Sequence, residues 1–514
     1  MPTRIEIHPA IGIARLGPSE EFFVAPEPGL PPPDRYRDAG GRLKRQAARF
    51  RLFECERDDA GILTTARELG PETGEITWTV HLVNRKGAAP NFAKPSGGRR
   101  NQATGNDEQD GALIIDPGPR SVSGRSAPPA PFDTGSFKET VVPLGDIRTD
   151  SFGRLLVCGG HGESDSVPPQ PNPERPIQGF ADSDGWFDDT ADGPVEATIR
   201  FASGDMVTAE PAWVIVGPAD FAPEIKNLVT LYDVAFDVAV REGQRSMPAT
   251  PSFVRDIQPI LQRAVDYQWV NRFANGGHSG SRPGNFASDW SALANPANPP
   301  AEAQFLLDRL RDSTQSPIPP PVESHARRWM PRLHDEHNDA RVLPVTSVQY
   351  TMLLQWAAGN FTGDLQNPPP PPDLLPDALD RAALESCSGG AFFPGIEVGQ
   401  VMKDPGTYEE PFRIARTMRP GQLTAGNALP WQADFHACTW EMQGFIGWWP
   451  AQRPDHVRPE NAATTMVDWA RGISGVQDGT DRDMVDGWHR LGIVRSRANA
   501  SGTMLLETER DPTL

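Results

Sequence analysis

The segment from Pro420 to Val457 concentrates large aromatic rings and constrains how the whole chain can fold. It holds four of the thirteen tryptophans, one of the four cysteines and two of the ten histidines. Each indole must bury a large apolar area or find a partner for its N–H group, so a surface loop is excluded. If the stretch DFHACTW is helical, Asp434 and Cys438 lie one turn apart on the same face. A carboxylate and a thiol are costly to bury among indoles for stability alone, which marks a candidate site.

Proline and glycine are frequent throughout the chain and argue against a simple helical bundle. The 514 residues include 54 prolines and 48 glycines, and 38% of the chain is hydrophobic. This composition indicates a loop-rich globular protein with short elements, long enough for two or three domains. The net charge of −19 argues against a nucleic-acid partner, because such partners need clustered Lys and Arg.

Several features point to a protein of the reducing cytoplasm. The four cysteines (Cys55, Cys158, Cys387 and Cys438) are too few and too scattered for a disulfide framework. No apolar run approaches the roughly 20 residues that span a bilayer, so we expect no membrane association. The N-terminal sequence MPTRIEIHPA lacks the pattern of a signal peptide. We therefore expect a cytoplasmic location, with non-classical export as the alternative.

The pattern of apolar residues predicts an α+β fold whose N-terminal half is a mainly antiparallel, β-sandwich-like structure. The clearest strand is Ile76–Asn84, which alternates and is rich in β-branched and aromatic residues. Further strands are expected at Glu21–Val24, Ala48–Phe53, Ala112–Ile115, Lys138–Val142, Leu155–Cys158, Val195–Phe201 and Ala212–Val216. Short strands parted by Gly, Pro and Asp clusters are typical of sandwiches.

After Pro223 the apolar spacing changes to three and four, which predicts a helical middle segment. Helices are expected at Ser252–Trp269, Pro300–Arg311 and Val348–Ala357, and another from Leu379 to Cys387 that ends at Gly389 and Gly390. The run QNPPPPPDLLP reads as a stiff linker. We predict a β-rich domain at 1–225, a mainly helical region at 226–366, a Pro-rich linker at 367–376 and a loop-rich C-terminal region at 377–514.

Three clusters of potential ligands raise the question of a metal. The aspartates of segment 179–194 could bind Ca²⁺, but they lack EF-hand spacing, and turn-forming aspartates explain them equally well. His334 and His337 flank Glu336 in the wrong order for an HExxH motif. From the residues alone, Cys438 could be a buried thiol or could form part of a zinc site with His436. We expect no metal.

Several segments together resemble one known family. Besides ALPWQADFHAC and WWPAQRPDHV, they are IEIHPAIGIARLG, VHLVNRK, GWFDDTADGPV, WVIVGPADFAP, GGAFFPGIE and GWHRLGIV. They resemble, in the same order, segments of the amino-acid oxidases that carry cysteine tryptophylquinone, the group of L-lysine ε-oxidase and glycine oxidase. The resemblance implies that Cys438 is joined by a thioether to a tryptophan whose indole has gained two oxygens.

The resemblance also assigns roles to residues around that cofactor. Trp488 in GWHRLGIV matches the modified tryptophan, and Trp469 is the second choice because VDWARG does not match. Asp434 matches the aspartate needed to make the cofactor, and it is a candidate proton acceptor if burial among the indoles raises its pKa. The implied activity is oxidative deamination of a primary amine, in particular of an amino acid. It proceeds through a Schiff base with the quinone and releases ammonia and hydrogen peroxide.

Further residues are expected in or near the substrate pocket. They are Cys387, His436, Trp448, Trp449, Arg453 and His489. Arg453 could bind a substrate carboxylate through its fork of donors, or form a salt bridge with Asp455 or another acid. Cys387 fits either a pocket residue or an ordinary buried thiol. Trp186 and its neighbours are expected to form a structural loop near the active site.

The implied partners are an amine or amino acid, dioxygen and a FAD-dependent flavoprotein that builds the quinone. The chain has no GxGxxG after a strand and thus no flavin motif of its own. We also expect a homo-oligomer. Two alternatives to the oxidase stay open: a tailoring enzyme that acts on a carrier- or peptide-bound amine, and a binding scaffold without oxidase activity.

Overall fold

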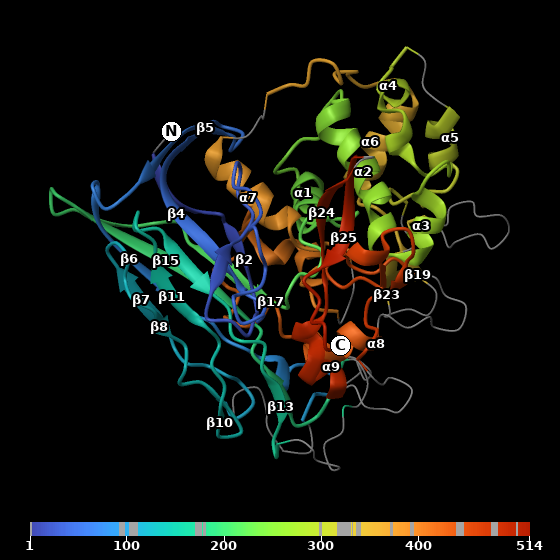
Figure 1. The fold of residues 1–514 in the computed structure, drawn as a ribbon. Coiled ribbons are helices and arrows are strands. Elements are labelled where there is room, and N and C mark those ends of the chain that lie inside the picture. The colour runs from blue at the N-terminus through green and yellow to red at the C-terminus, as the bar shows by residue number, and fades with distance from the viewer. Residues whose placement is uncertain are drawn as a thin grey trace.

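A computed structural model describes residues 3–514 apart from several internal segments, and Figure 1 shows its fold. The segments outside the description are 92–97, 102–110, 170–176, 178–180, 298–300, 316–329, 332, 336–340, 371–373, 391–394, 438–446, 474–481 and 500–501. In Figure 1 the large sheet occupies one side of the molecule, and helices α1–α6 gather on the other.

Within the described residues, thirteen strands form one mostly antiparallel sheet. Its main path runs through β7 (Arg120–Ser123), β6 (Gly74–Val80), β15 (Ala191–Phe201), β17 (Ala212–Gly217), β2 (Ile11–Arg15), β4 (Arg45–Arg57), β12 (Leu155–Cys158), β11 (Asp146–Thr149) and β8 (Ala130–Pro131). Off this path lie β1 (Arg4–His8), β3 (Phe22–Val24) and β5 (Leu63–Leu69), which pair with β4, and β16 (Met206–Thr208), which pairs with β15. The neighbours β17–β2 and β3–β4 are parallel.

The predicted sandwich is only partly right, because these strands form one curled sheet and not two facing sheets. The long strand β4 changes neighbours along its length. Its first half pairs with β12, whereas its second half pairs with β1 and β5. The strands β7 and β8, at opposite ends of the path, also lie close together. The sheet therefore curls almost into a barrel, and its inner face encloses a large apolar core.

The strands β2 and β17 are buried on both faces, and their side chains alternate between two cores. Ala14 and Val214 belong to the core inside the curled sheet, whereas Ile13 and Ile215 belong to a second core shared with the helices. A strand that is covered on both sides is apolar at nearly every position, and Arg15 at the end of β2 is paired with Glu397. The strand β6 is buried on one face only, and its buried and more exposed residues alternate as the sequence predicted.

Most predicted strands are present, and two predictions need correction. The strand predicted at Leu155–Cys158 is β12 with the same bounds. The stretch Ala112–Ile115 is not a strand, because only Ile115 makes an isolated bridge, to Asn84. The stretch Lys138–Val142 contributes the two-residue strand β10 (Thr140–Val141), which pairs with β9 (Ser136–Phe137) apart from the large sheet.

The middle of the chain is helical, as its spacing predicted. Its helices are α1 (Leu231–Arg241), α2 (Gln258–Asp266), α3 (Arg272–His278), α4 (Trp290–Leu293), α5 (Ala301–Leu307) and α6 (Ser347–Ala357). The sequence analysis missed α1, which begins at a capping box formed by Thr230 and Asp233. The prediction that α7 (Leu375–Glu385) ends at Gly389 is wrong. A Cβ on Gly389 would lie 2.0 Å from the carbonyl oxygen of Thr230, so this glycine permits a close backbone contact.

The C-terminal third consists of short elements that complete both cores. They are β20 (Tyr408–Glu410), β21 (Arg413–Ile414), α8 (Trp431–Ala437), β22 (His456–Val457), β23 (Val467–Asp468), α9 (Arg482–Gly487) and the pair β24 (Ile493–Asn499) and β25 (Gly502–Thr508). Small strand pairs elsewhere are β13 (Ser164–Ser166) with β14 (Trp186–Asp188), and β18 (Leu333–Asp335) with β19 (Arg341–Leu343). Trp431, Trp469 and Trp488 join the core inside the sheet. None of the described helices is long and apolar enough to cross a bilayer.

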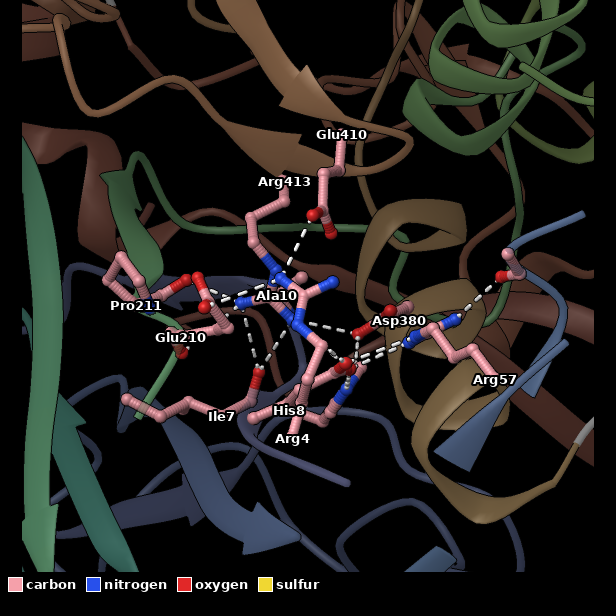
Figure 2. Close-up of polar contacts among 12 residues, drawn as sticks. Arg4, Ile7, His8, Ala10, Arg57, Glu210, Pro211, Asp380, Glu410 and Arg413 are labelled. Atoms are coloured by element: carbon pink, nitrogen blue, oxygen red, sulfur yellow. Dashed lines mark hydrogen bonds and ion pairs between the residues drawn. The ribbon is translucent and has the colours of Figure 1, made fainter. Parts of the chain in front are cut away.

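A buried network of charges fastens β1 to the C-terminal half of the chain (Figure 2). Nδ1 of His8 lies 2.9 Å from Asp380 of α7, and Nε2 lies 3.1 Å from Glu6. Arg57 donates two hydrogen bonds to Glu6, at 3.1 and 2.7 Å. Burial alone would lower the pKa of His8, but the charge of Asp380 and hydrogen bonds to both carboxylates raise it to about 10. His8 is therefore an imidazolium at neutral pH.

We expect Asp380→Asn to destabilise the fold by about 3 kcal/mol at neutral pH, because it removes a buried charge beside the imidazolium. Urea unfolding curves measure this difference. The pKa of His8 is raised above its ordinary value of 6.5, so its stabilisation is complete below pH 6.5 and is lost as the pH rises through about 10. The variant and the wild type should therefore converge at high pH.

The matched control for Asp380→Asn is Glu410→Gln. Glu410 pairs with Arg4 at 2.9 Å, at the half-exposed end of the same network. Loss of such an exposed pair should cost less than about 1 kcal/mol. Equal unfolding midpoints for wild type and Asp380→Asn at neutral pH would contradict the role given to His8.

Candidate active site

The helix α8 carries one of the expected site residues, Asp434, into the protein interior together with Trp431. Trp431 and Asp434 are both buried. The backbone N–H of Trp431 donates to Asp188 at 3.2 Å, and Asp188 is itself paired with the buried Lys86 at 2.7 Å. The start of α8 is thus anchored on β14. Cys438 follows directly after Ala437 and lies outside the described residues, so its predicted place on one face with Asp434 stays a prediction.

Trp488 lies in a short 3₁₀ turn at the end of α9 and packs against α8. Only 3% of its surface is exposed. Its ring centroid is 4.9 Å from that of Trp431 at an interplanar angle of 73°, and 6.4 Å from that of Phe221 at 86°. Such edge-to-face contacts are favourable between aromatic rings. Trp488 therefore lies beside α8, and Cys438 follows directly after the last residue of this helix.

Trp469, the second candidate for modification, has the surroundings of an ordinary core tryptophan. Its ring packs on Phe221 at 5.0 Å and on Phe435 at 6.0 Å. Its Nε1–H donates to the carbonyl oxygen of Gly492 at 2.9 Å. Both the apolar ring and the polar group are therefore accommodated without any modification.

Asp434 forms a buried ion pair with Arg453. Nη1 of Arg453 donates both to the carboxylate of Asp434 and, at 2.8 Å, to its backbone carbonyl oxygen. The guanidinium also lies 5.5 Å from the ring centroid of Trp449. Of the two roles considered for Arg453, the structure shows the salt bridge, and its partner is Asp434, whereas Asp455 accepts backbone N–H groups. Arg453 thus places a positive charge against the buried carboxylate of Asp434.

Two site residues that the sequence analysis did not single out are Asp189 and Gly162. Asp189 follows β14 in the loop expected near the active site, and its carboxylate accepts the N–H of Gly162 at 2.7 Å. Gly162 has φ +84°, and a Cβ there would lie 2.2 Å from Cζ2 of Trp488. Burial raises the pKa of Asp189 well above its usual range. The adjacent aspartates in GWFDDTADGP are a signal in the sequence, but nothing in the sequence links Asp189 to Gly162 or Gly162 to Trp488.

The aspartates once considered as a calcium loop are engaged by protein donors. Asp182 pairs with Arg100 at 2.7 Å, and Asp188 pairs with Lys86. Asp192 accepts hydrogen bonds from Thr424 and Trp213. These carboxylates have structural roles in the described part of the loop.

One group of residue types that bind metals lies close together in the described part of the chain. Glu6, His8 and Cys55 place one ligand atom each within 4.8 Å of one another. Arg57 donates two hydrogen bonds to Glu6, and its positive charge would repel a cation at this position. The group therefore belongs to the charge network of β1. His337 and the side chain of His334 lie outside the described residues.

The remaining expected pocket residues lie in different surroundings. His489 is half-buried with its ring 5.8 Å from that of Trp488, and burial together with Arg37 and Arg490 lowers its pKa. Cys387 donates its S–H to Glu397 at 2.6 Å, and burial raises the pKa of this thiol well above its usual range. Cys387 is therefore a protonated thiol in the helical core. The side chain of His436 lies outside the description.

Trp448 lines an apolar cavity of about 290 Å³ among the helices. Its ring stacks on Tyr267 at 5.3 Å and meets His278 edge-on at 5.0 Å. Burial lowers the pKa of His278 to about 4, so this ring is neutral at physiological pH. The cavity belongs to the helical core, whereas Trp488 belongs to the core inside the sheet.

Comparison with known proteins identifies relatives over most of the chain. Residues 8–216 match the family model described as L-lysine ε-oxidase N-terminal, and residues 330–457 match that of the L-lysine ε-oxidase C-terminal domain. The L-lysine 6-oxidase of Marinomonas mediterranea is 28% identical over 86% of this chain and 72% of its own length. The second match includes Asp434, Cys438 and Arg453, whereas Trp488 follows it.

Solved structures of an L-lysine ε-oxidase from Marinomonas mediterranea share the fold. One, described as the Schiff base intermediate with L-Lys, has a TM-score of 0.78 and 25% identity, and covers 99% of this chain and 95% of its own. Another structure of the same enzyme gives a TM-score of 0.77 with the same coverage. The two family models together match more than half of the chain. The chain therefore belongs to the L-lysine ε-oxidase family.

Proposed function

We propose that this chain is an amino-acid oxidase whose cofactor is a cysteine tryptophylquinone made from Cys438 and Trp488. Its family consists of enzymes named for the oxidation of an amine of an amino acid, which supports an amine-oxidising oxidoreductase. The observation that carries the cofactor assignment is the burial of Trp488 against Trp431 at the start of α8, the helix that leads into Cys438. Trp469, with its hydrogen bond to Gly492, remains unmodified in this proposal.

One buried donor beside Trp488 supports a ring that gains oxygens, whereas Gly162 crowds the benzo edge of this ring. A Cβ on Gly162 would lie only 2.2 Å from Cζ2, so this loop would have to shift to admit an oxygen there. Nε1 of Trp431 is buried beside the ring and finds no hydrogen-bond partner among the described residues. An added oxygen would give this donor an acceptor, and a buried donor without one is costly.

The quinone supplies an electrophilic carbonyl and a store for two electrons, which no unmodified side chain offers. The chain's own residues supply the rest of the site. The carboxylate of Asp434 accepts the proton that leaves the substrate carbon. Arg453 fixes the position of that carboxylate by bonding both its side chain and its backbone carbonyl. The rings of Trp431 and Phe221 exclude water from the reacting atoms.

The proposed substrate is the primary amine of an amino acid, as in the related L-lysine 6-oxidase by its name. Arg453 is engaged by Asp434, so its role is to hold that carboxylate and not to bind the substrate. Dioxygen takes the electrons and becomes hydrogen peroxide, while nitrogen leaves as ammonia. A FAD-dependent flavoprotein builds the quinone during maturation.

Peptide mapping by mass spectrometry tests the cofactor. In protein produced together with its flavoprotein, we expect a crosslinked peptide pair that joins Cys438 to Trp488 and carries two added oxygens. Cys438→Ser should abolish the crosslink because it removes the sulfur. Trp469→Phe is the control, and it should leave the crosslink intact. Unlinked Cys438 and Trp488 in mature wild-type protein would refute the assignment.

Replacement of Asp434 tests the proton acceptor. We expect Asp434→Asn to lower amine-dependent peroxide release, expressed per quinone, by about 100-fold or more, because an amide cannot take the proton. Quinone content from peptide mapping separates this loss from incomplete maturation.

The matched control for Asp434→Asn is Asp455→Asn. Asp455 is also buried, but it accepts the backbone N–H groups of Arg272 and His456 at 3.2 and 2.7 Å. Its replacement should leave peroxide release per quinone within twofold of wild type, an order-of-magnitude expectation of roughly 0.4 kcal/mol. An unchanged rate per quinone in Asp434→Asn would remove this residue from the mechanism.

A further inference from the structure

A polar cavity of about 490 Å³ lies where the loop between β4 and β5, the helices α1 and α7, and the turn between β20 and β21 meet. This volume is within the range of sites for small organic ligands. Its walls include the charge network of β1, through Arg4, His8, Arg57, Asp380 and Arg413 (Figure 2). In Figure 1, β5 and α7 lie toward the opposite end of the molecule from α8 and α9, and none of the described residues that line the cavity belongs to α8 or α9.

Arg245 carries a positive charge in this cavity that no carboxylate neutralises at close range. It donates to the carbonyl oxygens of Gln244 at 3.0 Å and Gly61 at 3.3 Å, and it forms no ion pair with any described residue. Only two of its five N–H groups are used in these bonds. The other cations that line the cavity each have a carboxylate oxygen within 3.8 Å: Arg4 has Glu410, Arg57 and Arg413 have Glu6, and His8 has Asp380.

Arg57 and Arg245 donate to the same atom, which brings two like charges together at one wall of the cavity. Nη1 of Arg57 donates to the carbonyl oxygen of Gly61 at 3.1 Å, and Nη2 of Arg245 donates to the same oxygen at 3.3 Å. Burial and the charge of Arg57 lower the pKa of Arg245, and the opposite effects of Asp377 and Glu410 do not reverse this shift. An added negative charge at this wall would therefore be attracted by both guanidinium groups.

The same cavity also has a wall of stacked aromatic rings. Tyr232 stacks on Phe236 at 6.1 Å and on Phe412 at 5.1 Å between ring centroids, with interplanar angles of 7°. Phe412 has φ +65°, a conformation that is unfavourable for a bulky side chain and that clusters at ligand sites. Ile62, which also lines the cavity, is 46% exposed. The cavity thus offers both a cationic wall and an apolar wall to one ligand.

We propose that this cavity binds a small organic anion, with its carboxylate or phosphate group on Arg245 and Arg57 and its apolar part against Phe412 and Tyr232. The planar guanidinium of Arg245 can form paired hydrogen bonds with either oxoanion, and Arg57 adds a second positive charge. The stacked rings provide favourable contacts for a flat apolar group. The inference does not rest on the proposed quinone, so the failure of one leaves the other in place.

Isothermal titration calorimetry of the full chain with benzoate and phenyl phosphate tests this site. We expect saturable binding of at least one of these anions, and the tighter of the two identifies the preferred oxoanion. Inorganic phosphate should bind more weakly than phenyl phosphate because it lacks the ring, and benzamide should bind more weakly than benzoate because it lacks the charge. Arg245→Gln should weaken the affinity for the preferred anion by about tenfold or more, because it removes the charge.

Phe412→Gly is an independent variant, since glycine adopts a positive φ readily and the change removes only the ring. It should weaken the preferred aromatic anion and leave inorganic phosphate unchanged. This variant decides the question if Arg245→Gln fails to fold.

The matched control is Arg241→Gln. Arg241 is the last residue of α1, but it pairs with Asp237 at 3.2 Å and does not line the cavity. Its replacement should leave the affinity for both anions unchanged. The proposal is overturned if neither anion binds saturably, if benzamide binds as tightly as benzoate and inorganic phosphate as tightly as phenyl phosphate, or if Arg245→Gln binds both anions like the wild type.

Discussion

The strands β2 and β17 are covered on both faces, so the rest of the molecule must supply an apolar core on each side of them. One side of the two strands faces the core inside the curled sheet, and the other faces the core of the helices. Trp431, Trp469 and Trp488 of the C-terminal third pack into the core inside the sheet. The elements that carry the proposed quinone are therefore enclosed by strands from the first half of the chain, which explains how distant segments build one dry site.

Local patterns predicted most elements of this fold but not how the strands join. The alternation of β6 and the apolar run of β12 are properties of single strands, and both were predicted. Whether strands form two sheets or one depends on pairing at long range, such as the change of neighbours along β4. The helix α1 was missed because three valines and Phe236 lie among its eleven residues, and these residue types also favour strands. Gly389 was taken for a helix end although its role is a contact with a distant backbone.

The candidate site was predicted where the sequence itself carries a signal. The dense aromatic segment and the family resemblance pointed to Asp434 and Trp488, and the structure places Asp434 on α8 and Trp488 against that helix. The pairing of Asp434 with Arg453 could not be predicted, because several acids were possible partners. Asp189 and Gly162 could not be assigned either. Their significance depends on a ring about three hundred residues away, and only the fold brings these groups together.

The burial of Trp488 has a consequence for how the protein is made. With 3% of its surface exposed, this indole cannot be touched by a second macromolecule once the chain has closed around it. A flavin held inside another protein is far too large to reach the ring. Under the proposed function, the flavoprotein that builds the quinone would therefore have to engage the chain before its interior closes, or supply a reagent as small as dioxygen or peroxide. In either case the timing of folding relative to oxidation would decide whether a newly synthesised chain becomes active.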